Sequence, residues 1–376
     1  ALVVDEYGTM DFVQSASGIF SRDISGDGTV WVSGLDEDEA ITFSGTISLS
    51  TGLMAGSDGH INIADTGSIT VTGTASTVLL EHEGSSLNNA GILTQIGVSS
   101  AVNVQVGATV DNSGTITAQS DAVYFAHGGG EINNLADGHI LSANAAGIVV
   151  HEMSTTVNNS GEIKGGYHGI LFYDDGSVTN NEGGTIESTG NEAILSWGDL
   201  QLANAGLITA PSVAIRLMET GTITNRDGGT IHSDGNNSAI FGTGTTGTGT
   251  DRQLTAVELR GGGTVTNQEG GIIKVTEPDS YGAIWSAYST GDVTVENYGE
   301  ISGGAYTITA DGGGKVIIKN YGSIITGDEF AVWLSSANDS MTMYDGSTVT
   351  GSIEMDSGDD EVDLQAGSLM TGDLYG

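Results

Sequence analysis

Two groups of carboxylates beside glycines are the residues best suited to chemistry in this sequence. Asp36-Glu-Asp-Glu39 follows Asp23-Ile-Ser-Gly-Asp-Gly28, and Asp356-Ser-Gly-Asp-Asp-Glu361 lies much further along the chain. Ca²⁺ prefers such oxygen ligands on glycine-containing turns. We therefore expect Ca²⁺ as the one cofactor, although solvated acidic turns would give the same pattern. The candidate ligands are Asp23, Asp27, Asp36, Asp38, Asp356, Asp359 and Asp360.

An enzyme acting on acidic polysaccharides would need clustered carboxylates and a basic residue that binds or deprotonates the sugar. The chain has nine Lys and Arg residues. We find no pair of aspartates that recurs at one repeat position with an arginine one or two repeats away. The histidines, including His127, His151 and His168, lack metal-ligand spacing and are expected at polar surface positions. With no cysteine either, the sequence favours a protein without catalytic activity.

The charge balance restricts the partners. The chain has 48 Asp and Glu residues against nine Lys and Arg, which gives a net charge of −39. Such a surface repels nucleic-acid phosphates and anionic lipid headgroups. No apolar run reaches the roughly 18 residues of a membrane helix. We therefore expect no nucleic-acid partner and no membrane insertion, and the acidity suits a secreted protein.

A repeated phrase organises the chain. Val-x-Asn-x-Gly-x-Ile occurs at 110–116 and 295–301, for example, and a form with two more residues before the last glycine occurs at 178–186. Most copies are 21–25 residues apart, and a fixed period of this size is the signature of a solenoid. The repeated asparagines are Asn89, Asn112, Asn134, Asn159, Asn180, Asn204, Asn225, Asn267, Asn297 and Asn320.

Between these copies a small residue precedes a large apolar one, as in Ala122-Val123 and Gly169-Ile170. Each repeat thus carries at least two short strands, and no segment has the period of an amphipathic helix. Short strands become stable when coils stack at about 4.8 Å and satisfy each other's backbone groups. We predict an all-β fold, a right-handed parallel β-helix of roughly 15 turns. The asparagines would form a ladder between coils or occupy corners that need a left-handed backbone.

Departures from the period set the predicted boundaries. Residues 1–40 are the least regular and would form an N-terminal cap or docking strand, and residues 41–376 would form the solenoid. The 42-residue interval between Asn225 and Asn267 contains a Gly/Thr run at 242–250. We therefore predict an extruded loop near 242–262. In residues 341–376 a Gly/Asp version replaces the asparagine motif.

The Asn-x-Gly-x-Ile repeats over about residues 85–325, together with 358–364 and 367–372, resemble the passenger β-helices of bacterial autotransporters and related surface adhesins. The resemblance implies a β-solenoid displayed outside the cell. It implies no particular activity, because that family includes adhesins, proteases and inert stalks.

Two functions remain open, and a polysaccharide-degrading enzyme is less favoured than either. The first is a secreted or cell-surface structural β-solenoid that joins copies of itself head to tail into a filament or surface layer, because open strand edges template further strands. The contact would use Leu2, Val3, Val4, Leu369 and Leu374. The alternative is an adhesin that binds surface glycans or neighbouring surfaces through 242–250 and outward tryptophans. These tryptophans are Trp197, Trp285 and Trp333.

Overall fold

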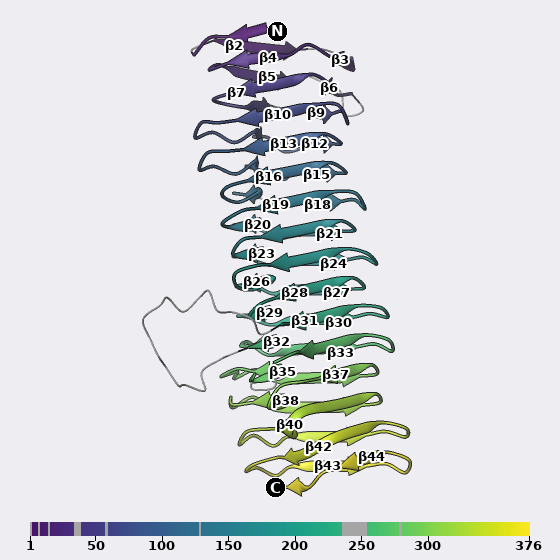
Figure 1. Ribbon diagram of the computed structural model, residues 1–376. Helices are drawn as coiled ribbons and strands as arrows, with labels where there is room; N and C mark the ends of the chain where they lie inside the picture. Colours follow the sequence, from purple (N-terminus) through teal and green to yellow (C-terminus); the bar gives the residue numbers. More distant parts are fainter. Residues whose placement is uncertain are drawn as a thin grey trace, which may run out of the picture. The chain divides into compact units, whose positions relative to one another are not determined.

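The computed structural model describes residues 2–6, 8–13, 16–33, 39–56, 59–127, 129–234, 254–277 and 280–376. These residues form strands and turns without a helix (Figure 1), which confirms the predicted all-β parallel solenoid. The chain divides into two compact units, 1–177 and 178–376. Strand β24 (Gly176–Asn180) contains the boundary. Within the described ranges, no helix is long and apolar enough to cross a lipid bilayer.

A regular coil contains three strands, where the sequence predicted at least two. In the first unit, one coil consists of β12 (Ser86–Asn89), β13 (Ile92–Gln95) and β14 (Val102–Val104). We call these positions the ladder, middle and far strands. The ladder strands are those of the sheet in which most strands end at the repeated asparagine. Strands of one kind pair in parallel between adjacent coils: β12 with β15, β13 with β16 and β14 with β17.

The strands of the first unit fall into these three kinds. The ladder strands are β3 (Gly18–Phe20), β6 (Ile41–Phe43), β9 (His60–Ile63), β12, β15 (Thr109–Asn112), β18 (Glu131–Asn134) and β21 (Thr155–Asn159). The middle strands are β1 (Leu2–Val4), β4 (Ile24–Gly26), β7 (Thr46–Leu49), β10 (Ser68–Val71), β13, β16 (Thr115–Ala118), β19 (His139–Ser142) and β22 (Glu162–Gly165). The far strands are β2 (Thr9–Val13), β5 (Thr29–Ser33), β8 (Leu53–Ala55), β11 (Val78–Leu80), β14, β17 (Val123–Phe125), β20 (Ala146–Val150) and β23 (His168–Phe172).

The second unit repeats the pattern. Its ladder strands are β27 (Leu200–Asn204), β30 (Gly221–Asn225), β33 (Gly263–Asn267), β36 (Val293–Asn297), β39 (Val316–Asn320), β41 (Ser340–Met343) and β43 (Glu361–Leu364). Its middle strands are β25 (Thr185–Ser188), β28 (Leu207–Ala210), β31 (Thr230–Ser233), β34 (Ile272–Val275), β37 (Glu300–Ser302) and β44 (Leu369–Thr371). Its far strands are β26 (Ile194–Ser196), β29 (Val213–Leu217), β32 (Thr255–Leu259), β35 (Gly282–Ser286), β38 (Tyr306–Ala310) and β45 (Leu374–Tyr375). Strands β40 (Ser323–Trp333) and β42 (Thr348–Glu354) are longer and run through both the middle and far positions.

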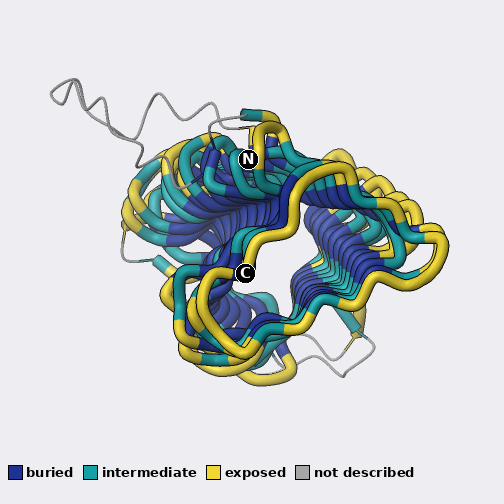
Figure 2. The backbone as a smooth tube through the Cα atoms, turned by 90° about the horizontal axis from the view of Figure 1, so that it is seen from below, coloured by how far each residue is buried: buried dark blue, intermediate teal, exposed yellow. Residues whose placement is uncertain are grey.

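The core lies inside the coils because successive side chains of a strand alternate between its two faces. In β15, for example, Val110 and Asn112 are buried while Thr109 and Asp111 are partly exposed. Figure 2 shows the buried residues along the inner side of the coils. The inward positions that repeat the Val, Ile and Ala of the motif are almost fully buried, so each coil contributes one apolar layer.

The repeated asparagines form hydrogen-bonded ladders inside both units. In the first, Asn89 donates to Asn112, Asn112 to Asn134 and Asn134 to Asn159, each at 2.8 Å from Nδ2 to Oδ1. In the second, the same bond of 2.8 to 2.9 Å links Asn180, Asn204, Asn225, Asn267, Asn297 and Asn320 in order. All of these side chains are buried. None has a positive φ, so the alternative role at left-handed corners does not apply to them.

The glycine of the motif is explained by close approach between coils. A Cβ at Gly299 would lie 2.2 Å from the carbonyl oxygen of Gly271, and a Cβ at Gly322 would lie 2.2 Å from that of Gly299. The longer form of the motif adds a glycine with a positive φ. Its extra glycine, such as Gly228 with φ +75° or Gly270 with φ +78°, takes the left-handed conformation that favours this residue.

Residues 1–40, predicted as the least regular part, contain strands β1 to β5. Strand β1 pairs in parallel with β4, and β2 pairs in parallel with β5. Strand β4 continues to β7 and β5 to β8. The coil pattern of the first unit therefore begins before residue 41.

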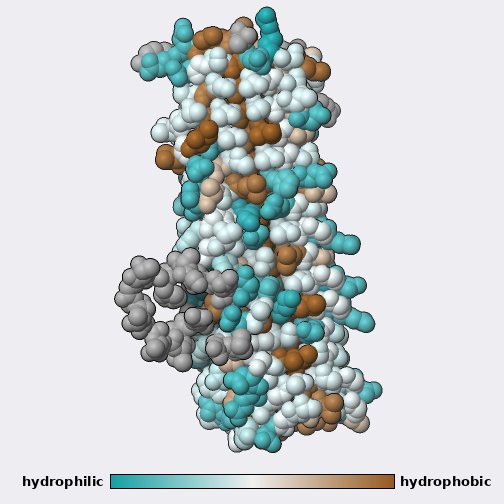
Figure 3. Space-filling view, in the orientation of Figure 1, coloured by the Kyte–Doolittle hydropathy of each residue, from teal (hydrophilic) through white to brown (hydrophobic). Residues whose placement is uncertain are grey.

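On the surface drawn in Figure 3, apolar side chains are scattered among polar ones.

We expect Asn112→Ala to lower the free energy of unfolding by about 3 kcal/mol, because it removes the ladder hydrogen bonds that Asn112 accepts from Asn89 and donates to Asn134, both in the buried interior. Chemical denaturation measures the loss. The matched control is Asn133→Ala, which removes two outward hydrogen bonds at a half-buried position, one of 2.8 Å to Asp111 and one of 2.9 Å from Asn158. The control should cost less than about 1 kcal/mol. Equal losses in the two variants would contradict the role given to the inner ladder.

Candidate functional site

A cluster of charged side chains lies on the outer face of the far strands in the second unit. Arg216 on β29 donates from Nε to Glu258 on β32 at 2.8 Å, and its Nη1 forms an ion pair with Glu192. Arg260 donates from Nε to the other oxygen of Glu258 at 2.6 Å. Both carboxylates are fully buried, whereas 19% of the Arg216 side chain is exposed. We call these four residues the ion cluster.

The ion cluster was not predicted from the sequence, where only pairs of aspartates at one repeat position were considered and the two carboxylates here belong to glutamates. The sequence nevertheless places Arg216 and Glu258 at equivalent positions of the repeat. Arg216 follows the inward Ile215 just as Glu258 follows the inward Val257. Because the interval between Asn225 and Asn267 is 42 residues long, the sequence alone does not show that Arg216 and Glu258 lie on adjacent coils. Because β29 and β32 pair directly, that interval is a single coil with an insertion.

The chemistry open to the ion cluster is limited. Arginine stays protonated in proteins and cannot act as a general base. Glu258 accepts from two guanidinium groups, one on each of its carboxylate oxygens, so both oxygens are engaged within the cluster. Both glutamates are also closed off from solvent. The cluster therefore pins neighbouring coils to each other and offers a substrate no free acid or base.

The prediction for Trp285 was wrong. Alternation along β35 does place its indole on the outer face, in register with Glu258 on one side and Thr309 on the other. The side chain is nevertheless only 1% exposed. Its ring lies 4.4 Å from that of Tyr281 and 5.9 Å from that of Tyr288, so aromatic neighbours cover it. Trp197 is 48% exposed as expected, and Trp333 is half-buried.

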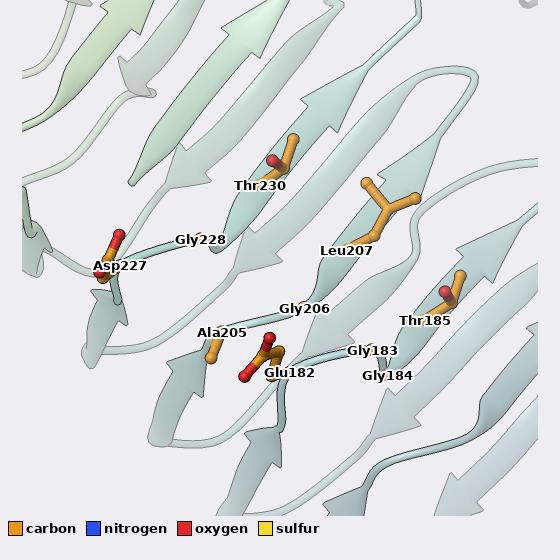
Figure 4. A pocket seen from close by; sticks show the side chains of 10 residues that line it. All are labelled: Glu182, Gly183, Gly184, Thr185, Ala205, Gly206, Leu207, Asp227, Gly228 and Thr230. Atoms are coloured by element: carbon orange, nitrogen blue, oxygen red, sulfur yellow. The ribbon is translucent and has the colours of Figure 1, made fainter. Parts of the chain in front are cut away.

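A groove of about 620 Å³ lies along the corners between ladder and middle strands of the second unit. Ala205 and Gly206 form a short corner between two long ones, which carry Glu182 with Gly183 and Asp227 with Gly228 (Figure 4). The long corners have two more residues and project beyond the short one. The lining contains two carboxylates, glycines and threonines, and no basic residue or histidine. This groove therefore lacks the cation that acidic sugars require.

The histidines fall into two groups. His127 and His151 are exposed, with Nδ1 at 3.0 and 4.0 Å from the carboxylate of Glu152, which agrees with the predicted polar surface positions. His168 is instead buried, with its ring 4.5 Å from that of Tyr167. The outward position expected for it was wrong because β23 is buried along both of its faces.

Two of the candidate calcium ligands accept hydrogen bonds from backbone amides. Asp23 accepts a hydrogen bond from the Thr46 backbone at 3.0 Å, and Asp360 accepts one from the Asp339 backbone at 2.8 Å. Burial raises the pKa of Asp339 to about 6. Asp27, Asp356 and Asp359 are also described, while Asp36 and Asp38 lie outside the described residues. Among the residues described, no three His, Asp or Glu side chains gather closely enough to hold a metal ion.

The side chains predicted for self-association differ in exposure. Val3 is 71% exposed, Leu369 57% and Leu374 50%, and Leu2 is partly exposed. Val4 belongs to the core. The predicted loop at 242–250 lies outside the described residues.

The chain matches a known family of β-helix domains. The family model of the BigA third pectate lyase-like domain matches residues 59–257, slightly more than half of the chain. The chain therefore belongs to this family of β-helix domains. Together with the parallel solenoid, the match confirms the predicted relation to passenger-type β-helices of bacterial surface proteins. No curated protein and no solved structure matches the chain.

We expect Arg216→Ala to lower the free energy of unfolding by about 3 kcal/mol, because it removes the cation that two buried carboxylates share. Arg226→Ala removes an arginine from an exposed corner of the same unit. It should change the stability by less than about 0.5 kcal/mol. Urea denaturation of both variants measures the difference, and similar stabilities would show that the ion cluster does not pin the coils.

Proposed function

We propose that this chain is a non-enzymatic structural module of a bacterial surface protein, and that its stacked coils present lateral surfaces outside the cell. The observation that supports this most is the closed ion cluster. Catalysis on a polysaccharide needs an acid or base within reach of the substrate. Arg216, Glu192 and Glu258 are instead committed to one another, and both carboxylates are buried.

The charge of the chain supports the same proposal. The pectate lyase-like name of the family describes a fold whose hosts include unrelated functions. A polyanion such as pectate would approach a chain with a net charge of −39 and nine basic residues. Such a chain repels an anionic polymer over distances of about a Debye length, roughly 8 Å at physiological salt. A structural or adhesive role requires no such approach.

Head-to-tail association and Ca²⁺ binding stay as secondary proposals. Exposed apolar side chains on β1, β44 and β45 support the first, and Asp23 and Asp360 beside backbone turns support the second. Sedimentation velocity at increasing concentration measures the association, and a mass that stays that of the monomer would contradict it. Titration of Ca²⁺ into the metal-free protein measures the binding through the melting temperature, and an unchanged melting temperature would contradict it.

We expect no cleavage of polygalacturonate or of neutral polysaccharides by the purified chain, with or without Ca²⁺. The measurement is the release of unsaturated uronates and of reducing ends, with heat-denatured protein as the blank. Glu258→Gln serves as the matched variant. Activity in the wild type that this substitution abolishes would contradict the proposal.

Antibody labelling of intact cells of the source bacterium tests the exposure outside the cell, and labelling only after lysis would contradict it.

A further inference from the structure

Three tyrosines form a stack on the corners between ladder and middle strands. The rings of Tyr298 and Tyr321 are 4.5 Å apart and inclined by 5°, and those of Tyr321 and Tyr344 are 3.9 Å apart and inclined by 9°. Each tyrosine occupies the position directly after the last residue of a ladder strand, on three successive coils. The stack therefore forms because parallel register repeats one outward position at the coil spacing.

One face of the stack has no tyrosine above it. The preceding coil carries Gln268 at the equivalent position, followed by Glu269. Its corner is of the long form and projects, whereas the corner of Tyr298 is of the short form. The step between them leaves a groove of about 360 Å³ lined by Gln268, Glu269, Tyr298 and Tyr321. This volume is near the lower end of the ~300–1,000 Å³ typical of small-molecule sites.

The stack is held in place by its neighbours. Lys319 on β39 donates to Glu296 on β36 at 2.8 Å, on the ladder-strand residues just before the asparagines that precede Tyr321 and Tyr298. The Tyr321 hydroxyl interacts with those of Tyr344 and Tyr298, which raises its pKa. A flat aromatic face fixed in this way loses little conformational freedom when a ligand binds.

We propose that this groove is a binding subsite for a neutral saccharide, which stacks one sugar ring on the side of Tyr298 that faces away from Tyr321. The Gln268 amide and the Glu269 carboxylate then receive the sugar hydroxyls. A rigid aromatic face with a few polar groups at its edge is the usual composition of a small-ligand site. The inference goes beyond the structural role proposed above and does not depend on it.

The charges select a neutral ligand over an acidic one. The lining contains one carboxylate and no basic residue, and the chain as a whole is strongly acidic. A uronate would place a second carboxylate near Glu269 without a cation to balance it. The Lys319 ammonium does not line the groove and is engaged by Glu296.

Saturation-transfer NMR on the whole chain tests the subsite with four probes: cellotetraose, maltotetraose, mannotetraose and, as the acidic comparison, tetragalacturonate. We expect transfer to the ring protons of at least one neutral probe. Tyr298→Ala should weaken that binding about tenfold, since it removes the stacking face. Tyr344→Ala is the matched control, because it shortens the same stack from the side away from the groove and should change the affinity by less than about twofold.

Gln268→Ala, at an exposed corner position, keeps the test decisive if Tyr298→Ala fails to fold, and it should also weaken binding. Asp227→Asn, in the other groove, should have no effect. The proposal is overturned if no neutral probe binds, if tetragalacturonate binds more tightly, or if Tyr298→Ala or Gln268→Ala binds as the wild type does. Equal losses in the Tyr298 and Tyr344 variants would overturn it as well. Such a result would leave the structural proposal untouched, because that proposal is tested by polysaccharide cleavage and cell labelling.

Discussion

The buried amide of each coil that carries a ladder asparagine must find its partners on the neighbouring coils, and this requirement fixes the register. Asn267, for example, donates to Asn297, to the carbonyl of Gly271 and to that of Glu300. A slip of one residue along β33 would turn Asn267 outwards and turn an outward threonine into the core. Because an unsatisfied buried polar group costs about 1–3 kcal/mol, each ladder position penalises every register but one.

Once the register is fixed, equivalent outward positions of successive coils necessarily lie above one another. For this reason, the charged and aromatic side chains of the outer surface are aligned in rows across successive coils. The position after Ile215 gives Arg216, Glu258 and Trp285 in one row. The position after the ladder asparagine gives Tyr298 and Tyr321 in another. A change of corner length shifts only the outline of the surface, so grooves arise where a long corner adjoins a short one.

The sequence predicted the ladder because Asn, Gly and Ile recur with nearly constant spacing. Such a period can be recognised from a single sequence without any structure. It did not predict the covering of Trp285. Alternation states which face of a strand a side chain occupies, but it does not state what lies over that face. Tyr281 and Tyr288 belong to turns on either side of β35, and turns carry no period. The ion cluster was missed for a related reason, since an insertion of unknown length separates Arg216 from Glu258 in sequence but not in register.

The interval between Asn225 and Asn267 also shows that such a fold accepts added residues at low cost. The added residues lie after β31 and before β32, and both strands keep parallel partners in the neighbouring coils. The ladder bond across the same coil, from Asn225 to Asn267, is 2.9 Å and matches the others. The entropy of closing a loop grows only with the logarithm of its length, so added residues between strands cost little as long as both flanking strands return to register. The inner amides and aliphatics therefore constrain evolution strongly, whereas corners, insertions and outward rows are free to vary. A binding function is for that reason expected on the sides of the coils, where Tyr298 and its groove lie.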